Sequence, residues 1–135
     1  MTQTESNTRR VVDALYAAYL AGDPEGMLAQ MDDDVDVRFL AQGTFHGRPA
    51  VRRFMQFSAG LLTDLDFRID HRIVDGDTAC VIWSESAITA AGKPWENHGV
   101  DVIRVRNEKV VALHENNDVN LVYEHFPPYV DVDRG

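Results

Sequence analysis

The sequence contains a single cysteine, Cys80, among its 135 residues. One cysteine cannot form a disulfide within the chain, so we expect a reducing compartment, with the cytoplasm as the default location. Basic residues are also few: 13 Lys and Arg stand against 22 Asp and Glu, which gives a net charge of −9. Because such a surface repels phosphate groups, neither nucleic acid nor an anionic membrane is an expected partner.

Long apolar runs are missing as well. No segment approaches the roughly 20 apolar residues that cross a bilayer, and the N-terminal stretch MTQTESNTRR lacks the apolar part of a signal peptide. The hydrophobic fraction of 44% is nevertheless ordinary for a folded protein. We therefore expect one soluble domain over residues 1–135.

Apolar periodicity in the first half of the chain predicts mainly helices. Residues 8–21 carry an apolar stripe at helical spacing, and Asp23 with Pro24 is typical of the start of a second, short helix. Residues 35–40 alternate as a short strand, and a third helix is predicted to begin near Pro49.

From residue 65 onward the apolar period changes to two, which is typical of strands. Turn sequences such as Asp75-Gly76 separate four predicted antiparallel strands. These strands span residues 67–74, 78–88, 95–106 and 110–118. The order of elements predicts an α+β fold in which three N-terminal helices pack on a curved, cone-shaped antiparallel sheet. The open end of such a cone is a natural pocket.

This order resembles the nuclear-transport-factor-like superfamily, in particular its SnoaL-like and ketosteroid-isomerase-like branch. The stretches YLAGDPEGMLAQMDDDVDVRF, FHGRPAVRRF and PWENHGVDVIRVRNEKVVALHENNDVNL carry the resemblance. It covers about residues 8–122 and leaves a tail, 123–135, which either packs as a lid or is disordered. The resemblance implies the α+β fold but not one reaction, because the superfamily contains isomerases, cyclases, dehydratases, epoxide hydrolases and non-enzymes.

Two acids match functional positions of these families. Asp118 matches the acid that the family usually carries near the end of its last strand. Asp101, in DVIRV, resembles the aspartic acid of ketosteroid isomerases that stays protonated and donates to a substrate oxyanion. The proton-shuttling base of those isomerases would fall near Phe39, where this sequence has no acid. That departure argues against steroid isomerisation itself.

A second comparison concerns epoxide hydrolases of the limonene type. These enzymes combine their acid with an arginine and a second aspartate on an earlier strand, and here Trp83 and Glu85 would occupy those two positions. Glu85 could serve as the second acid, but the arginine that would hold the acids ionised is missing.

The register of the last hairpin decides which polar side chains share a face. A three-residue turn would place Asp101 opposite Glu115, a cross-strand pair of acids that is costly unless one of them is protonated. The resemblance at Asp118 favours a two-residue turn instead, although a bulge could reconcile the two registers. The pairs in the favoured register are Asp101 with His114, Gly99 with Asn116, and Asn97 with Asp118.

The leading hypothesis is a small cofactor-free enzyme that moves protons beside a carbonyl group. It would cyclise, isomerise or dehydrate a hydrophobic polyketide- or terpenoid-like substrate. Asp118 would be the acid/base, Asp101 and Asn116 would donate to the oxyanion, and His114 would orient or relay. The expected substrate-binding residues are Tyr16, Tyr19, Phe39, Phe54, Trp83, Glu85, Trp95 and Asn97.

Other readings stay open. The same cone could be a non-catalytic module that binds an apolar ligand or dimerises, and Val and Ile side chains on the outer sheet face favour a homodimer in either case. The histidines lack metal-ligand spacing, so no metal is expected. His71 shares its parity with Phe67 and Ile69, which predicts a buried core histidine.

Overall fold

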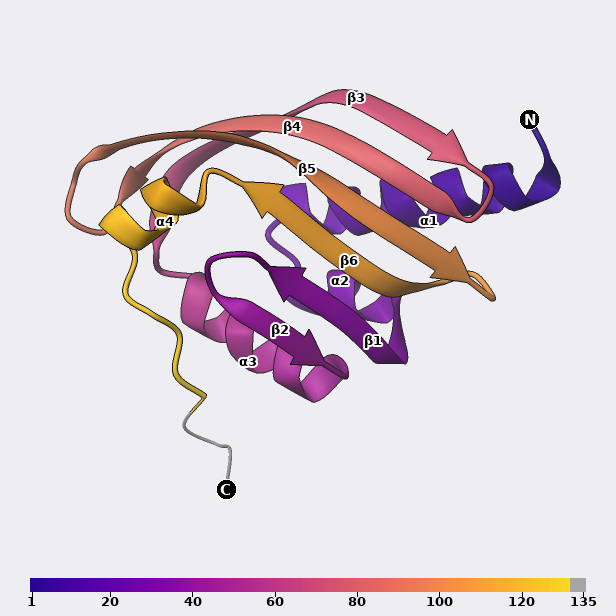
Figure 1. Cartoon of the computed structure of the whole chain (residues 1–135), viewed down its shortest axis with the longest axis horizontal. Coiled ribbons are helices and arrows are strands. Elements are labelled where there is room, and N and C mark those ends of the chain that lie inside the picture. The colour runs from indigo at the N-terminus through magenta and orange to yellow at the C-terminus, as the bar shows by residue number, and fades with distance from the viewer. Residues whose placement is uncertain (132–135) are drawn as a thin grey trace.

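The computed structural model describes residues 1–131 of the chain (Figure 1). Helices and strands follow in the order α1 (Gln3–Leu20), α2 (Pro24–Ala29), β1 (Met31–Phe39), β2 (Gly43–His46), α3 (Arg48–Ser58), β3 (Leu62–Asp75), β4 (Thr78–Thr89), β5 (Pro94–Arg106), β6 (Lys109–Asn117) and α4 (Val119–His125). No helix in this part of the chain is long and apolar enough to cross a membrane.

The strands form one curved sheet in the order β2-β1-β6-β5-β4-β3. Neighbouring strands run antiparallel except β1 and β6, which are parallel. In Figure 1 the strands β3 to β5 arch over α1, and α2 and α3 lie on the same side of the sheet. The predicted α+β fold, with three helices on a curved sheet, is therefore confirmed.

Local sequence signals explain where the first two helices begin. Thr2 and Glu5 form a capping box, in which each side chain accepts a hydrogen bond from the other residue's backbone N–H. Helix α1 therefore starts at Gln3, five residues before the start predicted from apolar periodicity, because its first turn is polar and held by the cap. Asp23 caps α2 with Pro24 at the first helical position, as predicted.

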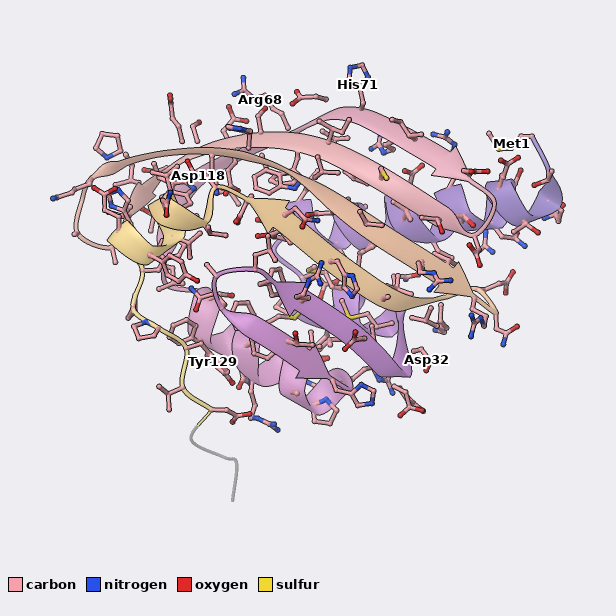
Figure 2. The ribbon with its side chains drawn as sticks, in the orientation of Figure 1. Met1, Asp32, Arg68, His71, Asp118 and Tyr129 are labelled. Atoms are coloured by element: carbon pink, nitrogen blue, oxygen red, sulfur yellow. The ribbon has the colours of Figure 1, made fainter. Side chains whose placement is uncertain are left out.

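Two short elements were not predicted. Strand β2 has four residues and pairs with β1 at the edge of the sheet, too short a segment to show a period. Helix α4 begins directly after β6, with Asp118 as its N-cap. The tail beyond α4 packs through Tyr129 against the rings of Phe45, Phe54 and Phe57 (Figure 2). Residues 132–135 of the predicted tail lie outside the described residues.

A β-bulge changes the face of one predicted core residue. The pairing of β3 with β4 shifts register between Ile69 and His71, so His71 turns to the outer side of the sheet and is exposed. Figure 2 shows its ring projecting away from the helices. The prediction of a buried core histidine was therefore wrong, because one extra residue in a strand inverts the parity of the residues after it.

Apolar packing forms two clusters. The larger joins α1 to the inner sheet face, with Val11, Leu15, Val81 and Ile103 at most 1% exposed. The smaller lies under α4 and contains Ala87, Trp95 and Val122. Burying a Val or Leu side chain stabilises a fold by about 1.5–3 kcal/mol, so the larger cluster stabilises the packing of α1 on the sheet. Residues of both clusters line a cavity between them.

Candidate active site

The hairpin of β5 and β6 brings Asp101 directly opposite Glu115. Its turn consists of Asn107 and Glu108, which have φ values of 51° and 61°. Positive φ at both positions is what a two-residue type I′ turn requires. The predicted turn length is therefore correct, but it does not lead to the predicted register.

One extra residue in β6 accounts for the difference. The pairing shifts between Arg104–Ala112 and Val105–Val110, which leaves Val111 as the additional residue of a bulge. The favoured register, with Asp101 opposite His114, was therefore wrong. The bulge lets Leu113 face Ile103 in the core and turns Glu115 inward beside Asp101.

The cavity between the two apolar clusters has a volume of about 510 Å³. This lies within the range of small-molecule sites. Aromatic and aliphatic side chains from α1, α2, α3, α4 and the sheet form most of its wall. The polar groups that α1 and the four long strands contribute are Tyr16, Tyr19, Glu85, Asn97, Asp101, Glu115 and Asn117. No Lys, Arg or His lines the cavity within residues 1–131.

Asp101 is a buried carboxyl group held by two neutral donors. Asp101 is only 5% exposed. Its carboxyl oxygens accept hydrogen bonds from the Tyr16 hydroxyl and from Trp83 Nε1, the latter at 3.0 Å. Burial raises the pKa of Asp101 to about 6, although the bonds from Tyr16 and Trp83 oppose the shift. The carboxyl group is thus mostly ionised at neutral pH, which is the form that can act as a base.

Glu115 is the carboxyl group most strongly biased toward its neutral form. Burial raises its pKa well above the usual value, and the charges of Asp101 and Glu85 raise it further. One carboxyl oxygen accepts a hydrogen bond from Asn117 Nδ2 at 2.8 Å. Since one member of an adjacent acid pair ionises first, Glu115 is the member that keeps its proton.

Glu85 and Tyr19 belong to the same part of the wall, and Asp23, the N-cap of α2, is a further acid among the lining residues. Glu85 accepts a hydrogen bond from Trp95 Nε1 at 3.1 Å, and burial raises its pKa against that bond. Burial also raises the pKa of Tyr19, and the negative charges of Glu85, Glu115 and Asp101 raise it further. The hydroxyl of Tyr19 therefore lies within the electrostatic reach of all three acids.

Two amide side chains of the wall keep one unpaired atom each. Asn97 is 4% exposed, and its Oδ1 accepts from the backbone N–H groups of His98 and Asp118. Among the described residues, Asn97 Nδ2 and Asn117 Oδ1 have no hydrogen-bond partner. A buried polar atom without a partner costs about 1–3 kcal/mol, so both atoms favour a bound polar group.

Three predicted catalytic residues do not line this cavity. Asp118 is exposed, and its Oδ1 caps α4 by accepting from Asn120 N at 3.1 Å and from Leu121 N at 3.4 Å (Figure 2). His114 and Asn116 lie on the other face of β6. There His114 Nε2 is 3.5 Å from an oxygen of Asp36, and Asn116 Nδ2 donates to the Val100 carbonyl of β5. The expected cavity positions of Asp118, His114 and Asn116 were wrong because they depended on the register without the bulge.

The other predicted site residues do converge. Those that line the cavity are Tyr16, Tyr19, Phe39, Phe54, Trp83, Glu85, Trp95, Asn97 and Asp101. Sequence reasoning missed Glu115 and Asn117 as site residues. The alternative register, which pairs the apolar residues Ile103 and Leu113, would have identified Glu115, because it also places Glu115 opposite Asp101.

Comparisons with known proteins agree with this fold. A family model described as SnoaL-like domain matches residues 12–113. A search of curated proteins finds no significant match. Among solved structures, an NTF2-like protein of unknown function from Burkholderia pseudomallei has a TM-score of 0.82 and 21% identity, covering 89% of this chain and 97% of that one.

Two further structures carry suggested activities. A protein from Jannaschia, suggested to be a SnoaL-like polyketide cyclase, has a TM-score of 0.82 and 13% identity, covering 95% of this chain and 98% of that one. A suggested isomerase from Bacillus subtilis has a TM-score of 0.79 and 14% identity, covering 92% and 95%. These structures share the fold, and the family match extends over most of the chain. The chain thus belongs to the SnoaL-like domain family.

Proposed function

We propose that this protein is an acid–base enzyme that moves protons beside the carbonyl group of an apolar small molecule. Cyclisation, isomerisation or dehydration would follow from the enol that forms. The observation that carries the proposal is the inward-facing pair of Asp101 and Glu115 in an otherwise mainly apolar cavity. The two acids differ in their surroundings, which is the condition for one to act as base and the other as acid.

Asp101 takes the proton from the carbon next to the carbonyl, and Glu115 gives its proton to the carbonyl oxygen. The C–H electron pair becomes the enol double bond, so no charge is left on the substrate. Opposite side chains of an antiparallel pair lie about 5 Å apart at Cβ, which lets the two carboxyl groups flank one carbonyl and its neighbouring carbon. The pKa of Asp101, about 6, suits a base that works near neutral pH.

Tyr16 and Trp83 act as positioning residues in this scheme. Each donates to a different oxygen of Asp101, which fixes the plane of the carboxyl group. The suggested cyclase and isomerase activities of the structural relatives are consistent with enol chemistry in this fold. Epoxide hydrolysis is not favoured, because the described cavity wall contains no arginine.

The test is hydrogen–deuterium exchange next to a carbonyl, which requires no knowledge of the natural substrate. Apolar ketones such as 2-tetralone are incubated with the protein in D₂O, and NMR follows loss of the α-hydrogens. We expect the protein to accelerate exchange and Asp101→Asn to slow it by about 100-fold or more. Asp118→Asn is the matched control, since it makes the same chemical change at an acid outside the cavity and should leave the rate unchanged.

Two results would contradict the proposal. One is full exchange activity in Asp101→Asn. The other is binding of the ketones, seen by chemical-shift changes of cavity residues, without any exchange above the buffer rate. The second result would instead support a binding module of the same fold.

A further inference from the structure

The cavity has an excess of hydrogen-bond acceptors over donors and no positive charge. Asp101, Glu85, Glu115 and the α2 cap Asp23 line it, whereas no basic side chain does so within residues 1–131. The hydrogen bonds to Asp101 and Glu85 come from tyrosine and tryptophan, which are neutral. A buried carboxylate without a counter-charge is unfavourable, so the site can bind a cation better than an anion.

The unpaired amide atoms show where a polar group of a ligand would lie. Cross-strand pairing joins Glu85 to Asn97, and Gly99, two residues further along β5, to Asn117. These residues therefore form one end of the cavity, next to the pair of Asp101 and Glu115. Asn97 is 4% exposed and keeps Nδ2 unpaired, while Asn117 keeps Oδ1 unpaired. Asn117 Oδ1 requires a donor, which an ammonium N–H supplies, whereas Asn97 Nδ2 requires an acceptor elsewhere on the ligand. This end is therefore suited to polar groups and not to another apolar ring.

Aromatic rings lie beside the acids. The Phe67 ring centroid is 5.0 Å from that of Tyr19 and 5.5 Å from that of Trp83. Trp95, whose indole donates to Glu85, adds a further ring. Ring faces attract cations, and they do so more strongly where water is excluded. A carboxylate beside aromatic rings is a combination that recognises an ammonium group.

We propose that the substrate is an apolar carbonyl compound that also carries a basic amine, with its ammonium group bound by Glu85 and Asn117 Oδ1. This inference rests on the proposed function, which assigns the carbonyl to Asp101 and Glu115. A hydroxyl group in place of the ammonium would satisfy the two amides, but it would leave Glu85 without a counter-charge. The charge on the ligand therefore separates the two possibilities.

Three aryl methyl ketones that differ only in their para substituent provide the test. They are 4′-(aminomethyl)acetophenone, 4′-(hydroxymethyl)acetophenone and 4-acetylbenzoate, which are cationic, neutral and anionic near pH 7.5. Isothermal titration calorimetry with the wild-type chain should show the amine binding about tenfold or more tightly than the alcohol, with the carboxylate weakest. In Glu85→Gln the amine should lose this advantage over the alcohol.

Several results would overturn the inference. The alcohol binding as tightly as the amine, the carboxylate binding best, or no binding of any probe would each do so. An advantage of the amine that persists in Glu85→Gln would remove the assigned site. The exchange assay keeps the two proposals apart: a neutral ketone that exchanges without an amine preference leaves the proposed reaction standing. An amine preference without exchange leaves only the ammonium site.

Discussion

At the scale of single residues, the site depends on two acids that share one buried region but differ in their hydrogen bonds. Asp101 receives two donors from Tyr16 and Trp83, whereas Glu115 receives one, from Asn117. Both pKa values are raised by burial, and that of Glu115 more strongly. The division into a base and an acid therefore follows from burial, neighbouring charge and hydrogen bonding, and not from residue type.

This division predicts a bell-shaped dependence of the exchange rate on pH. The rate should rise through the pKa of Asp101, about 6, as the base ionises, and fall at higher pH as Glu115 loses its proton. Glu115→Gln should lower the maximum rate and remove the descending limb, because Gln does not titrate. Rates measured between pH 4.5 and 9.5 check this, and a descending limb that survives in Glu115→Gln would assign it to another group.

The raised pKa of Glu115 also predicts that the free energy of unfolding depends on pH. The folded-state pKa of Glu115 lies above its value in the unfolded chain, so its neutral form stabilises the fold fully at low pH. That contribution is lost as pH rises through the folded pKa. Urea unfolding should therefore show Glu115→Gln gaining stability relative to wild type as pH is raised from about 5 to 9. An equal difference at both ends of this range would mean that Glu115 does not titrate differently on folding.

At the scale of elements, the close contact of β5 with Trp83 sets the position of Asp101. A Cβ atom at Gly99 would lie 2.5 Å from Trp83 Cζ2 and would also contact the Asn116 carbonyl oxygen. Glycine is therefore required there by space. The Trp83 indole can lie over Gly99 and still donate to Asp101.

Gly99→Ala should consequently destabilise the protein by about 1–3 kcal/mol through overpacking. It should also displace Trp83, which weakens the bond to Asp101 and slows α-hydrogen exchange. Thermal unfolding and the exchange assay measure the two effects. Gly76→Ala serves as a comparison, since it lies in a distant turn with a φ of 60° and no atom within 4 Å of its added Cβ. Backbone strain in Gly76→Ala should lower the stability but leave the α-hydrogen exchange rate of the folded protein unchanged.

Helix α4 depends on its cap. Asp118 accepts from two backbone N–H groups of the first turn, and Val122 and Phe126 from this region line the cavity. Asp118→Ala should lower stability by about 1 kcal/mol, whereas Asp118→Asn should be close to neutral because Asn is as good an N-cap. Denaturant unfolding of the two variants checks this. If both variants lose activity without losing stability, Asp118 has a chemical role that the capping geometry does not explain.

At the scale of the whole molecule, the outer face of the sheet is the surface that lacks cover. Ile73, Cys80, Val102 and His114 form one cross-strand row on that face, and Ile73 is 56% exposed. We propose that a second copy of the chain covers this face, as the sequence pattern predicted. Sedimentation should show a dimer that Val102→Glu converts to a monomer. A monomeric wild-type chain would contradict the proposal.

Sequence alone was sufficient for the fold class and for nine of the residues that line the cavity. Helical and strand periods are local properties of apolar spacing, so α1 through β6 were recognisable, apart from the four-residue β2. The family resemblance suggested site positions for Tyr16, Tyr19, Trp83 and Glu85. Asn97 was expected there because alternate residues of a strand share a face, which Asn97 shares with Asp101.

Tertiary structure decided which acid faces Asp101. The bulge at Val111 forms because it lets Leu113 meet Ile103 in the core, and no local pattern marks the extra residue. That one-residue shift moves His114 and Asn116 outward and Glu115 and Asn117 inward. Strand β6 ends at Asn117, and Asp118 is the cap of the helix that follows. The sequence by itself determined the fold and supplied the acids, and long-range packing of the core selected which of them meet in the cavity.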